Sequence, residues 1–506
     1  MSIDLTVGNL IEPVTGRRWD RSEIGRQVAR RIARLGQRGV IRGDRVFLPF
    51  GNRLEFFAEL LAVWRIGACA VPIDGRLTPF EIQTLISATR PKLAILDDDT
   101  DSSVASTFAA AGVAAVLTAE TGPQEADSRR SRLDDDALIL FTSGSTGNPK
   151  GVVHTHRSLR ARWLALRDHL GIAPFQRTLC LLPTHFGHGL ICNALFPWLA
   201  GQDLYVTPPF RPDLLMQLGT LIDDHDVTFL SSVPAVWRLA LKLARPPQMG
   251  SLRRVHCGSA PLSADAWEGI RAWTGAQQVC NAYGITETGS WVAGLADASE
   301  PAADGLIGEG WGTVLRVLRT AETARLYDRE LLCAAGESGH VWLNTAALMK
   351  GYFLHDDLTE RVVVDGWFLT GDIGVLDERG RLSLRGRERD EINRGGMKIY
   401  PADIDAVIEQ FEHTTDVCAF AVEDPVYGQS VGLAVALDSP GDDTVLSLYR
   451  WMRAHLAETK MPGHWWIVDA IPRTSRGKVN REMVRAACTD RPALDLPRII
   501  AEEGAA

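Results

Sequence analysis

Residues 137–151 read ALILFTSGSTGNPKG, an apolar run that leads directly into a loop of glycines and hydroxyl side chains. The run ALILF is short and continuously apolar, which is typical of a strand covered on both faces of a sheet. In the loop, the glycines permit close approach of the backbone, and the hydroxyls and successive N–H groups can surround an anion. The stretch therefore predicts an α/β sheet in which a buried strand ends at an anion-binding loop.

Lys150 supplies the positive charge of this loop. Only seven of the 54 basic residues are lysines, and Lys150, Lys398 and Lys478 lie in glycine-containing loops, where a compact charge on a flexible stem can reach one phosphate oxygen. The loop is not a Walker A loop, because Lys150 precedes Gly151 and not Ser or Thr. Residues 152–154 are of strand type, so we expect the loop to join two strands. The alternative, a plain hydroxyl-rich turn, needs no such set of anion-binding groups.

The bulk composition limits the class of protein. A length of 506 residues predicts several domains, and a net charge of −9 provides no basic excess for nucleic acid or an anionic membrane. Eight dispersed cysteines without a CxxC pair predict reduced, mostly buried thiols in a cytoplasmic protein. No signal peptide is expected at the N-terminus, and the apolar segment 56–73 is interrupted by Glu59 and Arg65, so no membrane partner is expected.

Segments of strand type alternate with helical ones along the chain, at 45–50, 93–96, 137–141 and 229–233 among others. Such alternation predicts mostly parallel sheets flanked by helices. A charged, glycine-rich run (RGRERDEINRGG, 385–396) then predicts a boundary between domains. We therefore expect a large N-terminal α/β domain at 1–386 and a small α+β domain at 387–506.

The loop TSGSTGNPKG (142–151) resembles the phosphate loop of the adenylate-forming superfamily, which contains acyl-CoA synthetases, nonribosomal-peptide adenylation domains and firefly luciferase. Further motifs follow in the family's order over nearly the whole chain: NAYGITETG (281–289), GWFLTGDIG (366–374), Gly386-Arg387 with GGMKIYPADID (395–405), and PRTSRGKVNR (472–481). The chain looks most like an acyl-CoA synthetase. The resemblance implies stacked α/β sheets with a small barrel-like subdomain, and a mobile C-terminal domain that turns on a hinge near Arg389.

The resemblance also implies ATP, Mg²⁺ and CoA as ligands, and assigns roles to matching residues. Lys478 would neutralise the carboxylate and the α-phosphate as they meet. Thr286 would contact the α-phosphate and Glu287 would bind Mg²⁺, while Tyr283 would stack on adenine and Asp372 would accept from the ribose hydroxyls. The nucleotide-binding set is expected to comprise Thr142, Ser143, Gly144, Ser145, Thr146, Gly147, Lys150, Gly258, Ser259, Ala260, Asn281, Ala282, Tyr283, Gly284, Asp372 and Arg387.

Two poses of the C-terminal domain would let one site run two reactions. One pose would deliver Lys478 for adenylation, and a swing about Arg389 would replace it with the loop of Gly395 and Gly396, which faces a pantetheine thiol in the family. Lys398 lies in the same motif. It is either close to the route of the thiol or an exposed loop lysine.

The segment 182–190 (LPTHFGHGL) is similar to the family segment that gates the acyl pocket, with Phe186 where many members carry histidine or another aromatic residue. No aspartate occurs between 181 and 200, which argues against an α-amino acid and for a plain carboxylic acid. His185 and His188 form an HxxH pair without an evident third ligand, so zinc is not expected. The expected acyl pocket comprises Phe186, Trp237, His256, Cys257 and Trp291.

The sequence thus predicts an ATP-dependent acid–CoA ligase, which activates a small non-amino carboxylic acid as acyl-AMP and transfers the acyl group to the CoA thiol. Two alternatives remain open. A stand-alone adenylating enzyme would load the phosphopantetheine of a separate acyl-carrier protein, because no carrier domain follows Arg481. A paralogue would keep the fold and run only one half-reaction.

Overall fold

The computed structural model describes residues 7–123, 131–142, 149–208, 212–259, 262, 264–295, 300–303, 305–387, 392–399, 401–472 and 481–494. Several residues singled out by the sequence lie outside these ranges: Ser143, Gly144, Ser145, Thr146, Gly147, Ala260, Arg389 and Lys478. Arg387 and Lys398 are described through their backbone only.

The first sheet has seven strands in the order β18-β8-β7-β4-β3-β5-β6. Its strands are β3 (Arg45–Leu48), β4 (Cys69–Pro72), β5 (Leu93–Leu96), β6 (Ala114–Leu117), β7 (Asp136–Thr142), β8 (Lys150–Thr155) and β18 (Gly351–Tyr352). The strands β3 to β7 are parallel, whereas β8 runs antiparallel to β7 and places Lys150 opposite Thr142. The segment predicted to bind an anion thus begins and ends at two neighbouring strands, as the sequence predicts.

Helices cover this sheet because their apolar faces need partners. They are α1 (Arg21–Gln37), α2 (Leu54–Ile66), α3 (Pro79–Thr89), α4 (Ser102–Ala110), α5 (His156–Leu170) and α11 (Asp356–Val362). In α2 almost every residue is buried, including Glu59, whose carboxylate is paired with the buried guanidinium groups of Arg31 and Arg34. Two cations on one carboxylate compensate a charge that burial alone would make very unfavourable.

The second sheet has fourteen strands, and its two halves differ in direction. The parallel half consists of β1 (Leu10–Glu12), β9 (Arg177–Cys180), β10 (Asp203–Val206), β11 (Phe229–Ser232), β12 (Arg254–Gly258) and β13 (Gln278–Ile285), with β2 (Arg17–Trp19) added antiparallel at the edge. The antiparallel half consists of β14 (Ser290–Gly294), β15 (Leu306–Gly310), β16 (Val314–Leu318), β17 (Ser338–Asn344), β19 (Val363–Val364), β20 (Trp367–Leu376) and β21 (Leu382–Arg387). Strand β13 belongs to both halves.

One helix beside the parallel half is a fully buried π-helix, η2 (His188–Leu195). The other helices around this half are α6 (Phe196–Leu199), α7 (Pro212–Met216), α8 (Leu218–Asp224), α9 (Pro234–Leu243) and α10 (Ala264–Thr274). Single 3-10 turns occur at η1 (Ala173–Phe175), η3 (Thr286–Thr288), η4 (Thr323–Arg325), η5 (Arg329–Leu331) and η6 (Glu458–Lys460). Because π-helical turns are rare and concentrate at functional sites, η2 marks this region for attention.

The C-terminal part has a sheet and a core of its own. The sheet comprises β22 (Ile392–Arg394), β23 (Met397–Ile399), β24 (Thr414–Asp424), β25 (Gly428–Leu437) and β26 (His464–Ile467), and its helices are α12 (Pro401–Ile408), α13 (Asp442–His455) and α14 (Arg481–Thr489). Ile392, Leu433 and Trp465 belong to one buried cluster of this part. The fold is therefore mixed α/β with a large N-terminal domain of several sheets and a small C-terminal α+β domain, as predicted.

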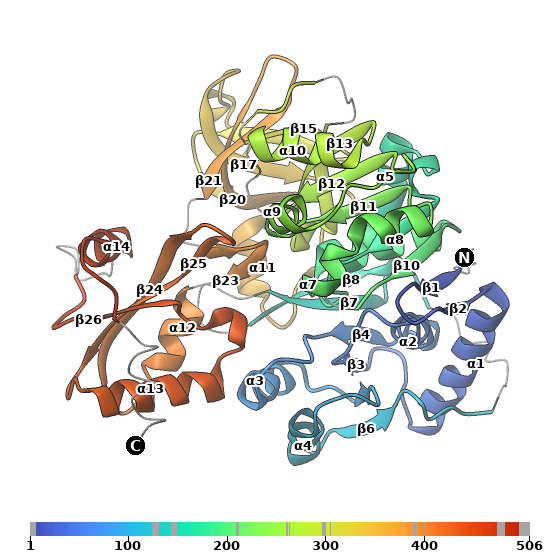
Figure 1. Cartoon of the computed structure of the whole chain (residues 1–506), viewed down its shortest axis with the longest axis horizontal. Helices are drawn as coiled ribbons and strands as arrows, with labels where there is room; N and C mark the ends of the chain where they lie inside the picture. The colour runs from blue at the N-terminus through green and yellow to red at the C-terminus, as the bar shows by residue number, and fades with distance from the viewer. Residues whose placement is uncertain are drawn as a thin grey trace.

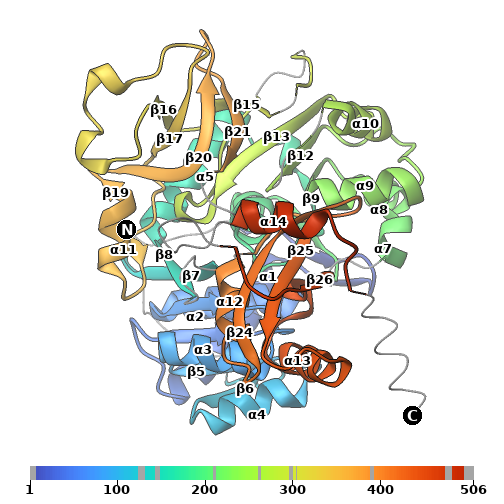
Figure 2. The ribbon, with the colours of Figure 1, turned by 90° about the vertical axis from the view of Figure 1, so that its left-hand side faces the viewer.

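Figures 1 and 2 show the C-terminal domain, coloured orange to red, beside the rest of the chain, with α13 close to α3. The rings of Phe80 and His455 meet edge to face at 5.1 Å, and Lys460 Nζ lies 3.1 Å from Glu81 Oε1. The two domains thus touch through a few side chains rather than through a shared core.

All eight cysteines are free thiols, and seven of them are buried. Within the described ranges, no helix has both the length and the apolar character needed to cross a lipid bilayer.

Candidate active site

The turn Thr286–Thr288 follows β13, and donors from four separate segments hold it and the next residue, Gly289. Each of the four backbone carbonyl groups from 286 to 289 accepts a hydrogen bond from a residue outside the turn. Nε2 of His154 donates to the carbonyl of Thr286 at 2.7 Å, and the backbone N of Met349 donates to that of Glu287 at 2.7 Å. The guanidinium of Arg162 donates to the carbonyl of Thr288 at 3.2 Å, and Sγ of Cys192 donates to that of Gly289 at 3.3 Å. Within the turn, the backbone N of Gly289 donates to the carbonyl of Thr286 at 3.1 Å, and the outside donors add to this bond, so the turn is fixed in one conformation.

Arg162 is fully buried and occupies the centre of this arrangement. Besides the carbonyl of Thr288, its guanidinium donates to the carbonyl of Trp311 at 2.8 Å and to the hydroxyls of Thr345 and Thr313 at 3.1 and 3.4 Å. Every acceptor that the described residues give it is neutral. Burial accordingly lowers the pKa of Arg162 to about 10, which leaves it charged at neutral pH. A fixed positive charge therefore lies directly beneath the turn that carries Glu287.

Tyr352 connects the end of the anion-binding loop to the carboxylate of this turn. Its hydroxyl donates to Glu287 Oε1 at 2.8 Å, and Lys150 Nζ lies 5.4 Å from the centre of its ring, within the range of a cation–π contact. Strand β18 places it there by pairing with β8, where Tyr352 lies opposite Val152. The sequence did not single out Tyr352, and its only signal there was the neighbouring glycine, Gly351. In the structure the φ of Gly351 is +156°, which favours glycine.

Two residues predicted to hold the nucleoside meet across the large sheet. Tyr283 on β13 donates its hydroxyl to Oδ2 of Asp372 on β20, and both side chains are buried. Asp372 lies opposite Arg387 in the pairing of β20 with β21. The amide of Asn281 instead donates to the carbonyl of Leu306 at 2.9 Å, which ties β13 to β15. The structure thus brings three of these predicted residues, Tyr283, Asp372 and Arg387, into one place.

The predicted glycines Gly258 and Gly284 have a packing reason. A Cβ at Gly258 would lie 2.3 Å from the carbonyl oxygen of Ala282, and one at Gly284 would lie 2.1 Å from that of Ser290. Both distances are far below van der Waals contact, so any larger residue would push neighbouring strands apart.

The π-helix places His188 beside two serines, Ser231 on β11 and Ser259 directly after β12. His188 Nδ1 lies 2.9 Å from Ser259 Oγ, and Nε2 lies 2.6 Å from Ser231 Oγ. The ring of Trp291 lies 5.5 Å from that of His188 and 4.5 Å from that of His256, which forms a buried aromatic wall. Phe186 adjoins His188, with 6.2 Å between ring centres. The sequence considered His188 only as a metal ligand, whereas the structure gives it two hydroxyl partners.

The five residues predicted for the acyl pocket do not all lie together. Trp237 and Cys257 belong to the core between the sheet and its helices, where the ring of Trp237 lies 5.6 Å from that of Trp273. His256 instead contacts Trp291 on the other side. His256 and Cys257 are neighbours on β12, so their side chains point to opposite faces of the sheet, and Trp237 on α9 lies on the side of Cys257. The five residues therefore do not form one wall, and their place in the acyl pocket stays a prediction.

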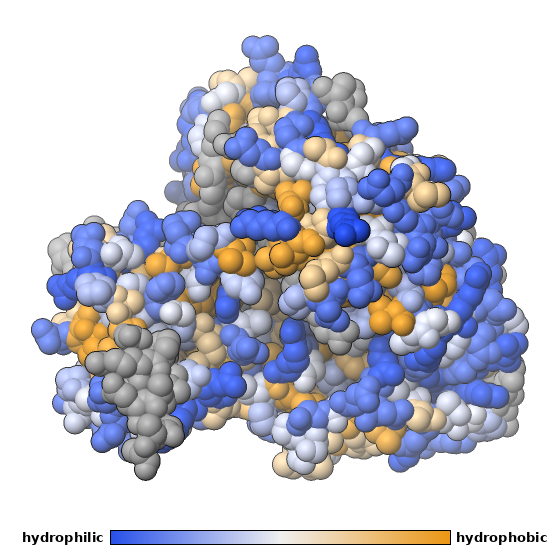
Figure 3. All heavy atoms as spheres, viewed as in Figure 1, coloured by the Kyte–Doolittle hydropathy of each residue, from blue (hydrophilic) through white to orange (hydrophobic). Residues whose placement is uncertain are grey.

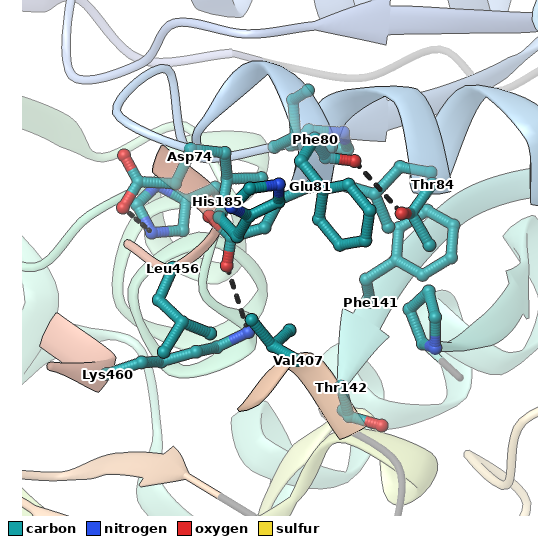
Figure 4. A pocket seen from close by; sticks show the side chains of 16 residues that line it. Asp74, Phe80, Glu81, Thr84, Phe141, Thr142, His185, Val407, Leu456 and Lys460 are labelled. Carbon is teal, nitrogen blue, oxygen red and sulfur yellow. Dashed lines mark hydrogen bonds and ion pairs between the residues drawn. The ribbon is translucent and has the colours of Figure 1, made fainter. Parts of the chain in front are cut away.

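A cavity of about 250 Å³ opens between the two domains (Figure 4). Apolar side chains form most of its wall: Ile73, Leu77, Phe80, Leu85, Phe141, Val407 and Leu456. Its polar lining includes Asp74 beside His185, and the ion pair of Lys460 with Glu81. Thr142, the last described residue before the anion-binding loop, also lines it. Thr142 and Pro149, the described residues on either side of 143–148, thus both lie at the wall of this mostly apolar cavity.

The histidines of this region are buried and neutral. Burial lowers the pKa of His154 and of His156 to about 4, and that of His188 to about 3. Among the described residues, no group of three histidine, cysteine or acidic side chains is placed to hold a metal ion. At neutral pH these imidazoles therefore carry no charge, and those of His154 and His188 act as hydrogen-bonding groups.

The depressed pKa of His156 predicts a loss of stability in acid. Its folded-state value of about 4 lies below the ordinary 6.5, so the unfolded chain binds more protons between these values and the free energy of unfolding falls as the pH falls. Relative to His156→Phe, the protein should lose about 1.4 kcal/mol between pH 7.5 and 5.5. Urea unfolding of both proteins at the two pH values measures this difference, and parallel losses would contradict it.

Arg162→Met should destabilise the N-terminal domain. The change removes the donor from two buried carbonyls and two hydroxyls, which we expect to lower the free energy of unfolding by about 2–4 kcal/mol. Arg157→Ala on the same helix is the control, because its pair with Asp134 is exposed and screened by solvent, so its loss should change the free energy of unfolding little. Equal stability of the two variants in urea would show that Arg162 does not hold the turn.

Two family models match this chain. The family model of AMP-binding enzymes matches residues 9–353, and that of the AMP-binding enzyme C-terminal domain matches residues 403–478. A probable CoA ligase of Humulus lupulus is 29% identical over 88% of this chain and 87% of its own length.

Among solved structures, a double mutant of o-succinylbenzoate CoA synthetase from Bacillus subtilis, bound to a product analogue, superposes with a TM-score of 0.84 over 97% of this chain and 96% of its own, at 23% identity. The same enzyme with its acyl-adenylate intermediate gives 0.67, over 95% of each chain and at 23% identity. An amide bond synthetase from Marinactinospora thermotolerans gives 0.83 at 23% identity, over 96% of this chain and all of its own. The chain belongs to the family of AMP-binding enzymes, within the adenylate-forming superfamily.

Proposed function

We propose that the protein is an acid–CoA ligase, which uses ATP to convert a non-amino carboxylic acid into acyl-AMP and then transfers the acyl group to the thiol of CoA. The observation that carries this proposal is the link from Lys150 through Tyr352 to Glu287, which unites the anion-binding loop with a carboxylate beside Thr286. The CoA ligases among its relatives support CoA as the acceptor.

In the first half-reaction the acid carboxylate attacks the α-phosphorus of ATP, a bond forms between the carboxylate oxygen and phosphorus, and pyrophosphate leaves. Lys150 would hold the β- and γ-phosphates, the hydroxyl of Thr286 would contact the α-phosphate, and Tyr283 with Asp372 would hold the nucleoside. Lys478, outside the described residues, would neutralise the two anions that meet. The buried charge of Arg162 adds a positive field beneath these groups.

The residues present fit a magnesium ion that keeps most of its ligands from water and phosphate. Glu287 is only partly buried, and its carboxylate is oriented by Tyr352, so one carboxylate oxygen can face the triphosphate. Glu287 would hold the ion, which would neutralise phosphate charge when bound.

In the second half-reaction the thiol attacks the carbonyl carbon of acyl-AMP, a carbon–sulfur bond forms, and AMP leaves with the carboxyl oxygen. The cavity between the domains is apolar and ends near Thr142, which suits the pantetheine arm of CoA. The higher TM-score with the product-analogue complex than with the acyl-adenylate complex of the same enzyme supports a domain arrangement of the thiol-accepting kind.

The polar groups of His188, Ser231 and Ser259 lie against the aromatic wall of Trp291 and His256. No carboxylate is among these residues, which supports an acid without an α-amino group. We therefore place the acyl group on this side of the sheet, next to Phe186 and His188.

Acid-dependent exchange of labelled pyrophosphate into ATP tests the first half-reaction. A panel of alkyl, aryl and polycyclic acids should contain at least one that supports exchange, and Lys478→Ala should reduce its rate by about 100-fold or more, the loss expected for one stabilising charge. Lys92→Arg, far from the motifs, is the control. Exchange that is unchanged in Lys478→Ala would overturn the role of this lysine.

Consumption of the CoA thiol with release of AMP tests the second half-reaction. Thiol loss with the acid that supports exchange is the expected result. Normal exchange without thiol loss for every acid would reject the CoA ligase and favour the separate carrier protein or a single half-reaction.

Tyr352→Phe should weaken the response to magnesium. The change keeps the ring beneath Lys150 and removes the hydroxyl that orients Glu287, so the magnesium concentration for half-maximal exchange should rise about 3–10-fold, the effect of one hydrogen bond of about 1 kcal/mol. Tyr449→Phe, a tyrosine of the C-terminal domain packed near Trp465, is the matched control. An unchanged magnesium dependence would remove Tyr352 from the site.

A further inference from the structure

The turn between β22 and β23 is docked on the N-terminal domain by one asparagine. The side-chain amide of Asn393 donates from Nδ2 to the carbonyl of Ser259 at 3.0 Å, and its Oδ1 accepts from the backbone N of Gly396 at 3.0 Å. The backbone N of Asn393 donates to Oε1 of Gln429 at 2.8 Å, which fixes the asparagine on its own sheet. One side chain therefore both shapes the turn and attaches it to the other domain.

Ser259 receives this contact in an unusual backbone conformation. Its φ is +66°, in the left-handed region that non-glycine residues seldom adopt. In this conformation its carbonyl accepts from Asn393, while its hydroxyl lies 2.9 Å from Nδ1 of His188. Since His188 also contacts Ser231, a chain of hydrogen bonds runs from the C-terminal domain to the side of the sheet where we place the acyl group.

The turn approaches the N-terminal domain so closely that it has room for no side chain at its tip. A Cβ at Gly396 would lie 2.8 Å from Cγ1 of Val233, and φ at this glycine is +91°. The neighbouring turn is fastened in parallel, because Arg238 Nε donates to the carbonyl of Val426 at 2.7 Å. Figure 3 shows hydrophobic side chains gathered where α9 meets the C-terminal domain.

We propose that Asn393 is a positioning residue for the thioester-forming step. Its amide holds the turn of Gly395 and Gly396 on Ser259, and through Ser259 and His188 the pose of the C-terminal domain is coupled to the acyl side of the site. The inference rests on the proposed function. In the adenylating pose another part of the domain faces the site, so Asn393 contributes to the second half-reaction and not to the first.

Separate measurement of the two half-reactions distinguishes this positioning role from a general structural role of Asn393. The acid from the panel with the fastest exchange serves as the substrate. Asn393→Ala should exchange pyrophosphate within about twofold of the unchanged protein, while formation of the thioester from preformed acyl-AMP at saturating CoA should slow about 10–100-fold. Asn344→Ala is the control, because that asparagine donates the same kind of bond, to the carbonyl of Gly366 at 3.0 Å, away from the domain interface.

Asn393→Asp distinguishes the contact with Ser259, which docks the turn, from the contact with Gly396, which shapes it. An aspartate keeps the oxygen that accepts from Gly396 and loses the donor to Ser259, so it should be as slow in thioester formation as Asn393→Ala. A near-normal rate in Asn393→Asp would overturn the docking contact, and so would equal losses of both half-reactions in Asn393→Ala. If no acid of the panel supported pyrophosphate exchange by the unchanged protein, the proposed function itself would fail, and the inference would fail with it.

Discussion

The buried guanidinium of Arg162 is the interaction on which the rest of the site depends. It reaches from α5 to the turn after β13, to Trp311 and Thr313 before β16, and to Thr345 after β17. Only a rigid donor with five N–H groups can satisfy so many acceptors at once, which explains an arginine here in place of a lysine. Because α5 follows β8 of the seven-stranded sheet and the acceptors lie next to strands of the antiparallel half of the large sheet, the contact fixes the two sheets against each other.

The residues predicted the fold class, because the apolar patterns that indicate strands and helices are local. The buried strand at 137–141 and the return of the chain as a second strand at 150–155 are readable from neighbouring residues. The direction of the strands from β14 to β21 could not be derived from periodicity, and the barrel-like subdomain came from the resemblance alone. Contacts between distant segments were out of reach: Tyr352 is 65 residues from Glu287, and Asn393 is 134 residues from Ser259.

The acyl pocket shows a second limit of sequence reasoning. His256 and Cys257 were both predicted for the acyl pocket, although the alternation of β12 sends their side chains to opposite faces of the sheet. The same rule, applied to β12 beforehand, would have separated them. His188 could not be assigned in this way, since its position depends on the π-helix, whose extra residue per turn changes which side chains face the sheet.

The scarcity of contacts between the domains has a thermodynamic consequence. The polar and ring contacts across the described interface include an amide–carbonyl bond at Ser259, a guanidinium bond at Val426, an ion pair at Glu81 and an edge-to-face ring pair at Phe80. Contacts of this kind each contribute about 1 kcal/mol, so together they favour the docked arrangement by only a few kcal/mol. Such a gap leaves a measurable minor population, and the difference in affinity between two successive ligands is then enough to reverse the balance in each catalytic cycle.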